Sequence, residues 1–152
     1  LAEGRAQGAT IYTLAETASD AAAEALAEQH DRADLLQGVD LNGADDVVAG
    51  VLMDLARMET APRAAGFAAQ VIESFAAADV RMHSQPWGEA GFTVLRAADI
   101  PSALLEIGFM SDRRDLANIL DPAWRAEMQE ALVAAILDWA DADQARRMRA
   151  LR

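Results

Sequence analysis

The apolar and polar positions at the start of the chain predict one strand followed by a long helix. Ala9–Leu14 is rich in β-branched and aromatic residues and follows Gly8, which is typical of a strand. Ser19 and Asp20 are good N-caps for an alanine-rich helix that should reach about Leu36.

A second helix is expected after the polar loop near residue 43. Asp45 or Asp46 would cap it. Its apolar residues recur at helical spacing, at Val48, Val51, Leu52 and Leu55. Because proline has no amide donor, Pro62 should interrupt this helix or begin a new one, and 63–78 should be helical.

Two short strands are expected in the second half of the chain. Residues 81–91 have an irregular composition that predicts a loop. Phe92–Leu95 and Ala103–Phe109 are the strand candidates, with a turn at Pro101 between them.

Two helices should complete the chain. Ser111 can cap a short helix over 112–120. Asp121 should cap the last helix, with Pro122 at the first helical position, where a missing amide costs nothing. One face of this helix carries Trp124, Met128, Leu132, Ala135 and Trp139.

Strands interleaved with helices predict an α/β fold, with a mostly parallel central sheet flanked by helices. At 152 residues, the chain is long enough for one domain with a buried core. It contains no run of 18 apolar residues, so no membrane span is expected.

Charge and cysteine content exclude several kinds of site. The 25 acidic residues outnumber 13 basic ones and give a net charge of −12. A nucleic-acid-binding protein needs a basic surface, so this class is not expected. The absence of cysteine excludes disulfides and thiolate metal sites.

Glu106 is the candidate catalytic residue that the pattern itself singles out. It lies in the apolar stretch 102–109, which should be a strand buried on both faces. A buried carboxylate is costly without a partner, and α/β enzymes place catalytic groups at the carboxyl ends of strands. Two other interpretations fit the same pattern: a side chain that points into solvent, or an ion pair with an arginine.

The sequence pattern shows no metal site. A catalytic zinc ion takes three protein ligands and keeps an open position, but the two histidines lie in separate segments. We expect His30 to lie on a solvated helix face and His83 to be a hydrogen-bonded loop residue. The chain also lacks a glycine-rich phosphate loop and a serine or cysteine nucleophile motif.

Several stretches, in the right order, resemble cell-wall N-acetylmuramoyl-L-alanine amidases of the AmiA/AmiB/AmiC type (Amidase_3). The most specific is Asp99–Ser111, which is similar to the family signature D-[IV]-P-S-V-L-[VL]-E-x-G-[FY]-[IL]-S-N. It departs from the family at Met110, where Ile or Leu is usual, and at Asp112, where Asn is usual. The other stretches are Gly8–Glu16, Ala33–Gly38, Val51–Arg57, Phe92–Arg96 and Asp121–Trp124.

The resemblance implies a periplasmic peptidoglycan hydrolase in which Glu106 is the general base and zinc activates a water molecule. It implies that residues 1–152 are the C-terminal part of one catalytic domain. The family's zinc ligands, two histidines and a glutamate, precede the strand that begins near Gly8, and nothing in this chain matches them. The substrate bond joins N-acetylmuramic acid to L-alanine of the stem peptide.

Some family members carry a helical insertion that covers the zinc until an activator of the LytM type displaces it. By resemblance, this insertion corresponds to about residues 19–79 here. An acid on it could occupy the open zinc position, and the candidates are Glu24, Glu28, Asp54 and Glu59. The alternative function is a non-catalytic regulatory module that binds an activator protein.

Overall fold

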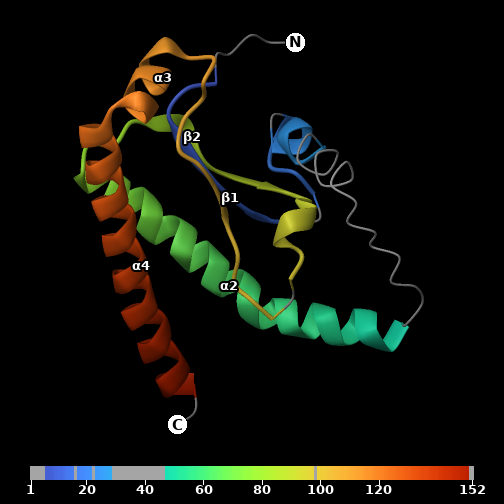
Figure 1. Cartoon of the computed structure of the whole chain (residues 1–152). Helices are drawn as coiled ribbons and strands as arrows, with labels where there is room; N and C mark the ends of the chain where they lie inside the picture. The colour runs from blue at the N-terminus through green and yellow to red at the C-terminus, as the bar shows by residue number, and fades with distance from the viewer. Residues whose placement is uncertain (1–5, 16, 22, 29–46, 98, 151–152) are drawn as a thin grey trace. The chain divides into compact units, whose positions relative to one another are not determined.

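The computed structural model describes residues 6–15, 17–21, 23–28, 47–97 and 99–150 (Figure 1). For residues 47–54 it describes the backbone but not the side chains. Its strands are β1 (Ala9–Leu14), β2 (Met82–Ala90) and β3 (Leu104–Glu106). Its labelled helices are α2 (Val47–Ala77), α3 (Arg113–Leu120) and α4 (Pro122–Ala150), with a 3-10 turn η1 (Thr93–Leu95). Residues 23–28 are also helical. The predicted α/β class is confirmed.

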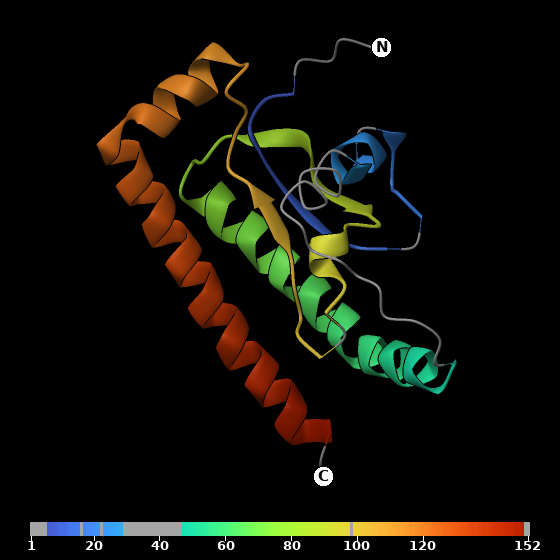
Figure 2. The same cartoon turned by 45° about the vertical axis from the view of Figure 1, so that its right-hand side comes forward.

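The three strands form one mixed sheet with β1 in the centre, in the order β2-β1-β3 (Figures 1 and 2). The amide of Ala9 donates to the carbonyl of Arg81 at 2.9 Å, and the amide of Ala15 donates to the carbonyl of Ala90 at 3.1 Å. Both partners advance in the same direction, so β1 and β2 are parallel. The strand predicted at Ala9–Leu14 is therefore confirmed with its boundaries.

The strand predicted at Phe92–Leu95 is wrong, and so is the loop predicted before it. Residues 93–95 form η1, and the strand is β2, whose sequence MHSQPWGEA lacks the usual alternation. Among the described strands β2 pairs only with β1, and an edge strand tolerates proline, here Pro86. Gly88 is also required there, because a Cβ atom on it would lie 2.5 Å from Cε1 of Tyr12.

The predicted interruption at Pro62 is also wrong, since α2 runs unbroken from Val47 to Ala77. Proline removes one hydrogen bond of the helix, and Pro62 itself is exposed. Burial elsewhere on the helix outweighs this local cost. The buried residues recur at helical spacing, at Ala64, Ala68, Val71 and Phe75. Leu55, expected on the apolar face, is instead 62% exposed.

The predicted helix caps are confirmed in two places and corrected in one. Oδ1 of Asp20 accepts a hydrogen bond from the amide of Ala23 at 2.9 Å. Oδ1 of Asp121 accepts one from Ala123 at 2.9 Å, as expected for α4. The cap of α3 is Asp112, not Ser111. The expected caps at 45 and 46, and the helix expected over 29–36, lie outside the described residues.

The chain divides into two units, and the strands and α2 contribute to both. The first comprises Leu1–Ile11, Gly66–Trp87 and Leu105–Arg152. Its buried residues include Val71 and Phe75 on α2 and, on α4, Met128, Ala131, Ala135 and Asp143. The rings of Phe67 and Trp139 meet edge to face with centroids 5.4 Å apart. The predicted apolar face of α4 is thus confirmed.

The second unit, Tyr12–Ala65 and Gly88–Leu104, has its own apolar core. Phe92 is fully buried and its ring centroid lies 5.3 Å from that of Tyr12. The other buried members of this cluster are Ala23, Ala27, Ala90 and Leu95. Phe92 and Leu95 are therefore core residues as their apolar character suggests, although they do not belong to a strand.

Replacing Pro62 by alanine should stabilise the protein. The substitution restores an amide donor at an exposed position of α2, and we expect the free energy of unfolding to rise by about 1–3 kcal/mol. Urea denaturation measures this change. The control is Glu59→Ala on the same helix, which removes only a surface ion pair with Arg63 and should change stability by less than about 0.5 kcal/mol. A loss of stability in Pro62→Ala would show that the fold requires the proline.

Replacing Phe92 by alanine should destabilise the protein by about 3–5 kcal/mol, because it leaves a cavity beside Tyr12. The control is Val94→Ala in η1, where the side chain is 55% exposed and the expected change is within about 0.5 kcal/mol. Thermal unfolding followed by circular dichroism compares the two. Equal effects would contradict the core assignment of Phe92.

Candidate active site at the end of β3

The candidate catalytic residue, Glu106, is the last residue of β3. All three residues of β3 are half-buried, so the prediction of a strand buried on both faces is wrong. The strand is also shorter than the predicted 103–109. After Glu106 the chain leaves the sheet and reaches α3 within seven residues. What holds this connecting segment therefore bears on the conformation of the chain directly after Glu106.

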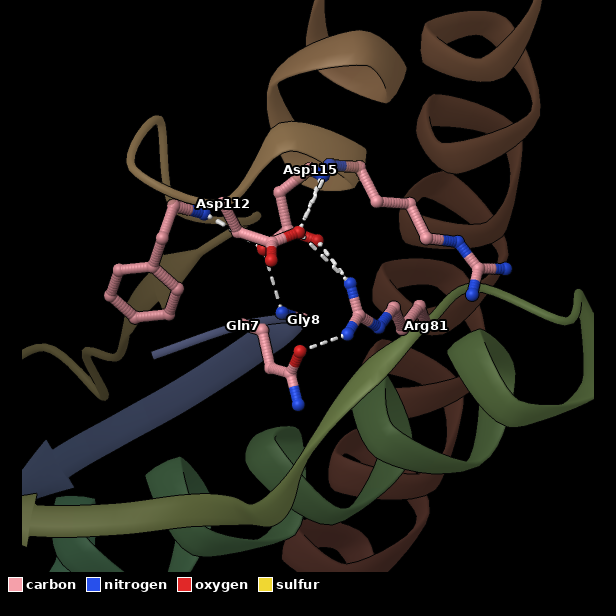
Figure 3. A network of polar contacts seen from close by, with 7 residues as sticks. Gln7, Gly8, Arg81, Asp112 and Asp115 are labelled. Atoms are coloured by element: carbon pink, nitrogen blue, oxygen red, sulfur yellow. Dashed lines mark hydrogen bonds and ion pairs between the residues drawn. The ribbon is translucent and has the colours of Figure 1, made fainter. Parts of the chain in front are cut away.

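The connecting segment is held by a buried carboxylate, that of Asp115 in the first turn of α3 (Figure 3). The side chain of Asp115 is 3% exposed. Its Oδ2 atom accepts hydrogen bonds from the amide of Phe109 at 3.0 Å and from the amide of Gly8 at 2.7 Å. One oxygen atom thus joins the segment after Glu106 to the residue that precedes β1.

Two glycines allow the backbone to approach this carboxylate closely. Gly8 has φ of +80°, and a Cβ atom on it would lie 2.6 Å from the carbonyl carbon of Met82. A Cβ atom on Gly108 would lie 3.2 Å from Cβ of Asp115. A side chain at either position would displace a segment that Asp115 binds.

The charge of Asp115 is compensated by Arg81, which lies directly before β2 (Figure 3). Nη1 of Arg81 lies 3.1 Å from Oδ1 of Asp115 and 3.1 Å from Oδ1 of Asp112. The second guanidinium nitrogen, Nη2, donates to the side-chain oxygen of Gln7. A guanidinium group suits this position because its donors are fixed in one plane and can serve several acceptors.

Asp112 belongs to the same network, and its backbone amide donates to the carbonyl of Phe109 at 3.0 Å, but among the described residues no hydrogen bond joins its side chain to the backbone around Glu106. Its Oδ1 accepts hydrogen bonds from the amides of Asp115 and Arg114, both at 3.1 Å. The bond from Asp115 is the main reason that the pKa of the Asp112 carboxyl lies below its ordinary value, and Arg81 lowers it further. Asp112 therefore stabilises the fold when ionised, and this contribution is lost as the pH falls through the lowered pKa.

The described residues contain no group of three or more His, Asp or Glu side chains placed to hold a metal ion. His83 is a hydrogen-bonded residue of β2, as expected: its Nδ1 atom lies 3.1 Å from both the carbonyl oxygen and the amide nitrogen of Gln85. His30 lies outside the described residues. The described residues therefore do not by themselves fit a zinc ion.

The acids considered as zinc blockers show no feature that selects one of them. Glu24 and Glu28 are exposed on the helical segment 23–28. Glu59 lies 3.9 Å from Arg63, with its side chain 69% exposed. The side chain of Asp54 lies outside the described residues. Their proposed role stays a prediction.

The second unit contains a cavity of about 820 Å³ that does not include Glu106. Its walls come from the end of β1, the middle of α2 and the segment 89–102. Two arginines in this wall serve the fold: Nη2 of Arg57 donates to the carbonyl of Arg96 at 3.2 Å, and Nη2 of Arg96 donates to the carbonyl of Gly91 at 3.4 Å.

In the helices that the structure describes, none is long and apolar enough to span a membrane.

The sequence pattern makes Glu106 a candidate but does not point to Asp115 or Arg81. Asp115 looks like an ordinary acid in the first turn of a polar helix, where aspartate is common. The residues that could have pointed to a buried carboxylate here lie in other segments: they are Gly8 and Gly108, which allow the backbone to approach Asp115 closely. No local pattern connects these three positions.

The comparisons with known proteins agree on one family. The family model of N-acetylmuramoyl-L-alanine amidases, Amidase_3, matches residues 1–138. AmiA of Salmonella typhimurium is 27% identical over 136 residues, which cover 89% of this chain and 47% of the relative. AmiA of Escherichia coli K12 is 26% identical over the same shares.

AmiC of Escherichia coli O6:H1 is 28% identical over 130 residues, which cover 85% of this chain and 31% of the relative. The chain thus spans about half the length of the AmiA proteins it matches and about a third of this AmiC. With a family model that matches most of its length, the chain belongs to the N-acetylmuramoyl-L-alanine amidase family, Amidase_3.

Proposed function

We propose that the protein to which this chain belongs hydrolyses the amide bond between N-acetylmuramic acid and L-alanine in peptidoglycan, with Glu106 as the general base. The observation that carries the proposal is the position of Glu106: it ends β3, and the backbone that follows is fixed by the buried Asp115. The names of the AmiA and AmiC relatives support the choice of bond.

In the proposed reaction, the carboxylate of Glu106 accepts a proton from a water molecule as its oxygen attacks the amide carbonyl carbon. The tetrahedral intermediate then collapses, the C–N bond breaks, and Glu106 returns the proton to the departing nitrogen of L-alanine. The products are the free lactyl carboxyl group and the free amine of the stem peptide. A positioned general base contributes about 10²–10⁴-fold to the rate of such a reaction.

The proposal includes a zinc ion, as the family resemblance implies. When bound, zinc would polarise the carbonyl group and lower the pKa of a bound water molecule. Because the described residues do not fit the ion, its ligands would have to come from other residues, and the steps above assign nothing to it.

The proposed location is the periplasm, where peptidoglycan lies. The helical segments within 19–79, residues 23–28 and α2, support the proposal of a helical insertion that a LytM-type activator displaces. The competing proposal is that the chain serves as a regulatory module that binds such an activator and performs no hydrolysis itself.

Replacing Glu106 by glutamine should reduce the release of stem peptides from purified peptidoglycan by about 10²–10⁴-fold, because glutamine cannot accept the proton. The rate is measured on the protein extended upstream to the start of its reading frame. The matched control is Glu89→Gln in β2, which keeps an acceptor for the hydroxyl of Thr13 and should retain activity. Unchanged release by Glu106→Gln would remove Glu106 from the reaction.

Zinc content should depend on the residues upstream of Gly8. We expect the extended protein to contain about one zinc ion per molecule and to lose stem-peptide release when zinc is chelated, and the chain 1–152 alone to contain none. Metal analysis by mass spectrometry measures this. An extended protein that binds no zinc and releases no stem peptides would favour the regulatory module instead.

A further inference from the structure

The contacts of Asp115 link the backbone beside Glu106 to two other segments of the first unit. Phe109 is three residues beyond Glu106, and its amide donates to Oδ2 of Asp115 at 3.0 Å. The same oxygen accepts the amide of Gly8, 107 residues away in sequence, at 2.7 Å. The end of β3 is therefore joined to the start of β1 through a side chain of α3 (Figure 3).

Such a contact is strong because it is buried and charged. A carboxylate that is 3% exposed loses its hydration, and hydrogen bonds from backbone amides together with a guanidinium group replace it. Arg81 supplies the positive charge at 3.1 Å. Moving the carboxylate away from these partners would leave a buried charge poorly compensated, so the contacts restrain the two amides.

We infer that Asp115 is a positioning residue for Glu106. By fixing Phe109 and Gly8, it holds the short segment 106–109 in one conformation, and this segment sets the direction from which the carboxylate of Glu106 meets the attacking water. The inference rests on the proposed function of Glu106. A misplacement of about 1 Å in a reacting group can reduce a rate by about 100-fold, so the loss of such a contact should affect the chemical step.

The test uses Asp115→Asn. Asparagine keeps one oxygen to accept the two backbone amides. Its NH₂ group then faces the guanidinium group of Arg81, and because both groups are hydrogen-bond donors, this contact is lost. We expect kcat of the upstream-extended protein to fall by about 10- to 100-fold, with KM within about twofold of its original value. In the chain 1–152, the amide of Phe109 should exchange its hydrogen faster than in the unsubstituted chain.

The matched control is Asp112→Asn. Asp112 shares Arg81 and the first turn of α3 with Asp115, but no hydrogen bond joins its side chain to Phe109 or Gly8 among the contacts of the described residues. Asparagine also remains a good N-cap. This variant should lose some stability at neutral pH and keep both kcat and the slow exchange of the Phe109 amide.

A second variant changes the backbone segment that Asp115 binds and leaves Asp115 itself unchanged. Gly108→Ala leaves every charge in place but puts a methyl group 3.2 Å from Cβ of Asp115. It should reproduce the selective fall in kcat, and it replaces Asp115→Asn if that protein does not fold.

The inference is overturned if these variants lower the melting temperature but leave kcat per folded molecule equal to that of Asp112→Asn, since Asp115 would then only stabilise the fold. This failure is distinct from failure of the proposed function. In the first case Glu106→Gln still lowers the rate of hydrolysis by about 10²–10⁴-fold, whereas in the second Glu106→Gln remains fully active.

Discussion

The hydration that a carboxylate gives up on burial has to be replaced, and at Asp115 three different segments replace it. The amides of Gly8 and Phe109 bind one oxygen and the guanidinium group of Arg81 binds the other. Each partner comes from a different part of the sequence, so the network forms only when β1, β2 and α3 have reached their places. This requirement favours one arrangement of the segments at this end of the sheet, because a shift of any one of them removes a partner from a buried charge.

Arg81 extends this constraint to the register of the sheet. Its backbone carbonyl accepts the amide of Ala9 at 2.9 Å, which is the first contact between β1 and β2, while its side chain binds Asp112 and Asp115. A slip of β2 by one residue would move both groups together. The sequence of β2 has no regular alternation that would set its register, and two single residues specify it instead: Arg81 directly before the strand and Gly88 within it, which lies close to the ring of Tyr12.

The difference between local sequence signals and contacts between distant segments explains which elements the sequence predicts. Elements with a strong local signal were predicted correctly: β1 from its β-branched residues, and α4 from Asp121, Pro122 and its apolar face. Elements that depend on tertiary contacts were not. The pattern of β2 is not that of a strand, and α2 continues through Pro62 because burial of Val71 and Phe75 outweighs one missing hydrogen bond. Glu106 is a candidate from the sequence because the motif around it is local, whereas the contacts of Asp115 come from distant parts of the chain.

The geometry of the Asp115 contact also relates the ends of β1 and β3 to each other. One oxygen binds the amide before β1 and the amide after β3, so the start of β1 and the end of β3 lie at the same end of the sheet. Gln7, the residue before Gly8, is bound at this end by Arg81, whose Nη2 atom donates to its side-chain oxygen. The cavity of the second unit is lined by the opposite end of β1, by Thr13 and Leu14, and has no part in this arrangement.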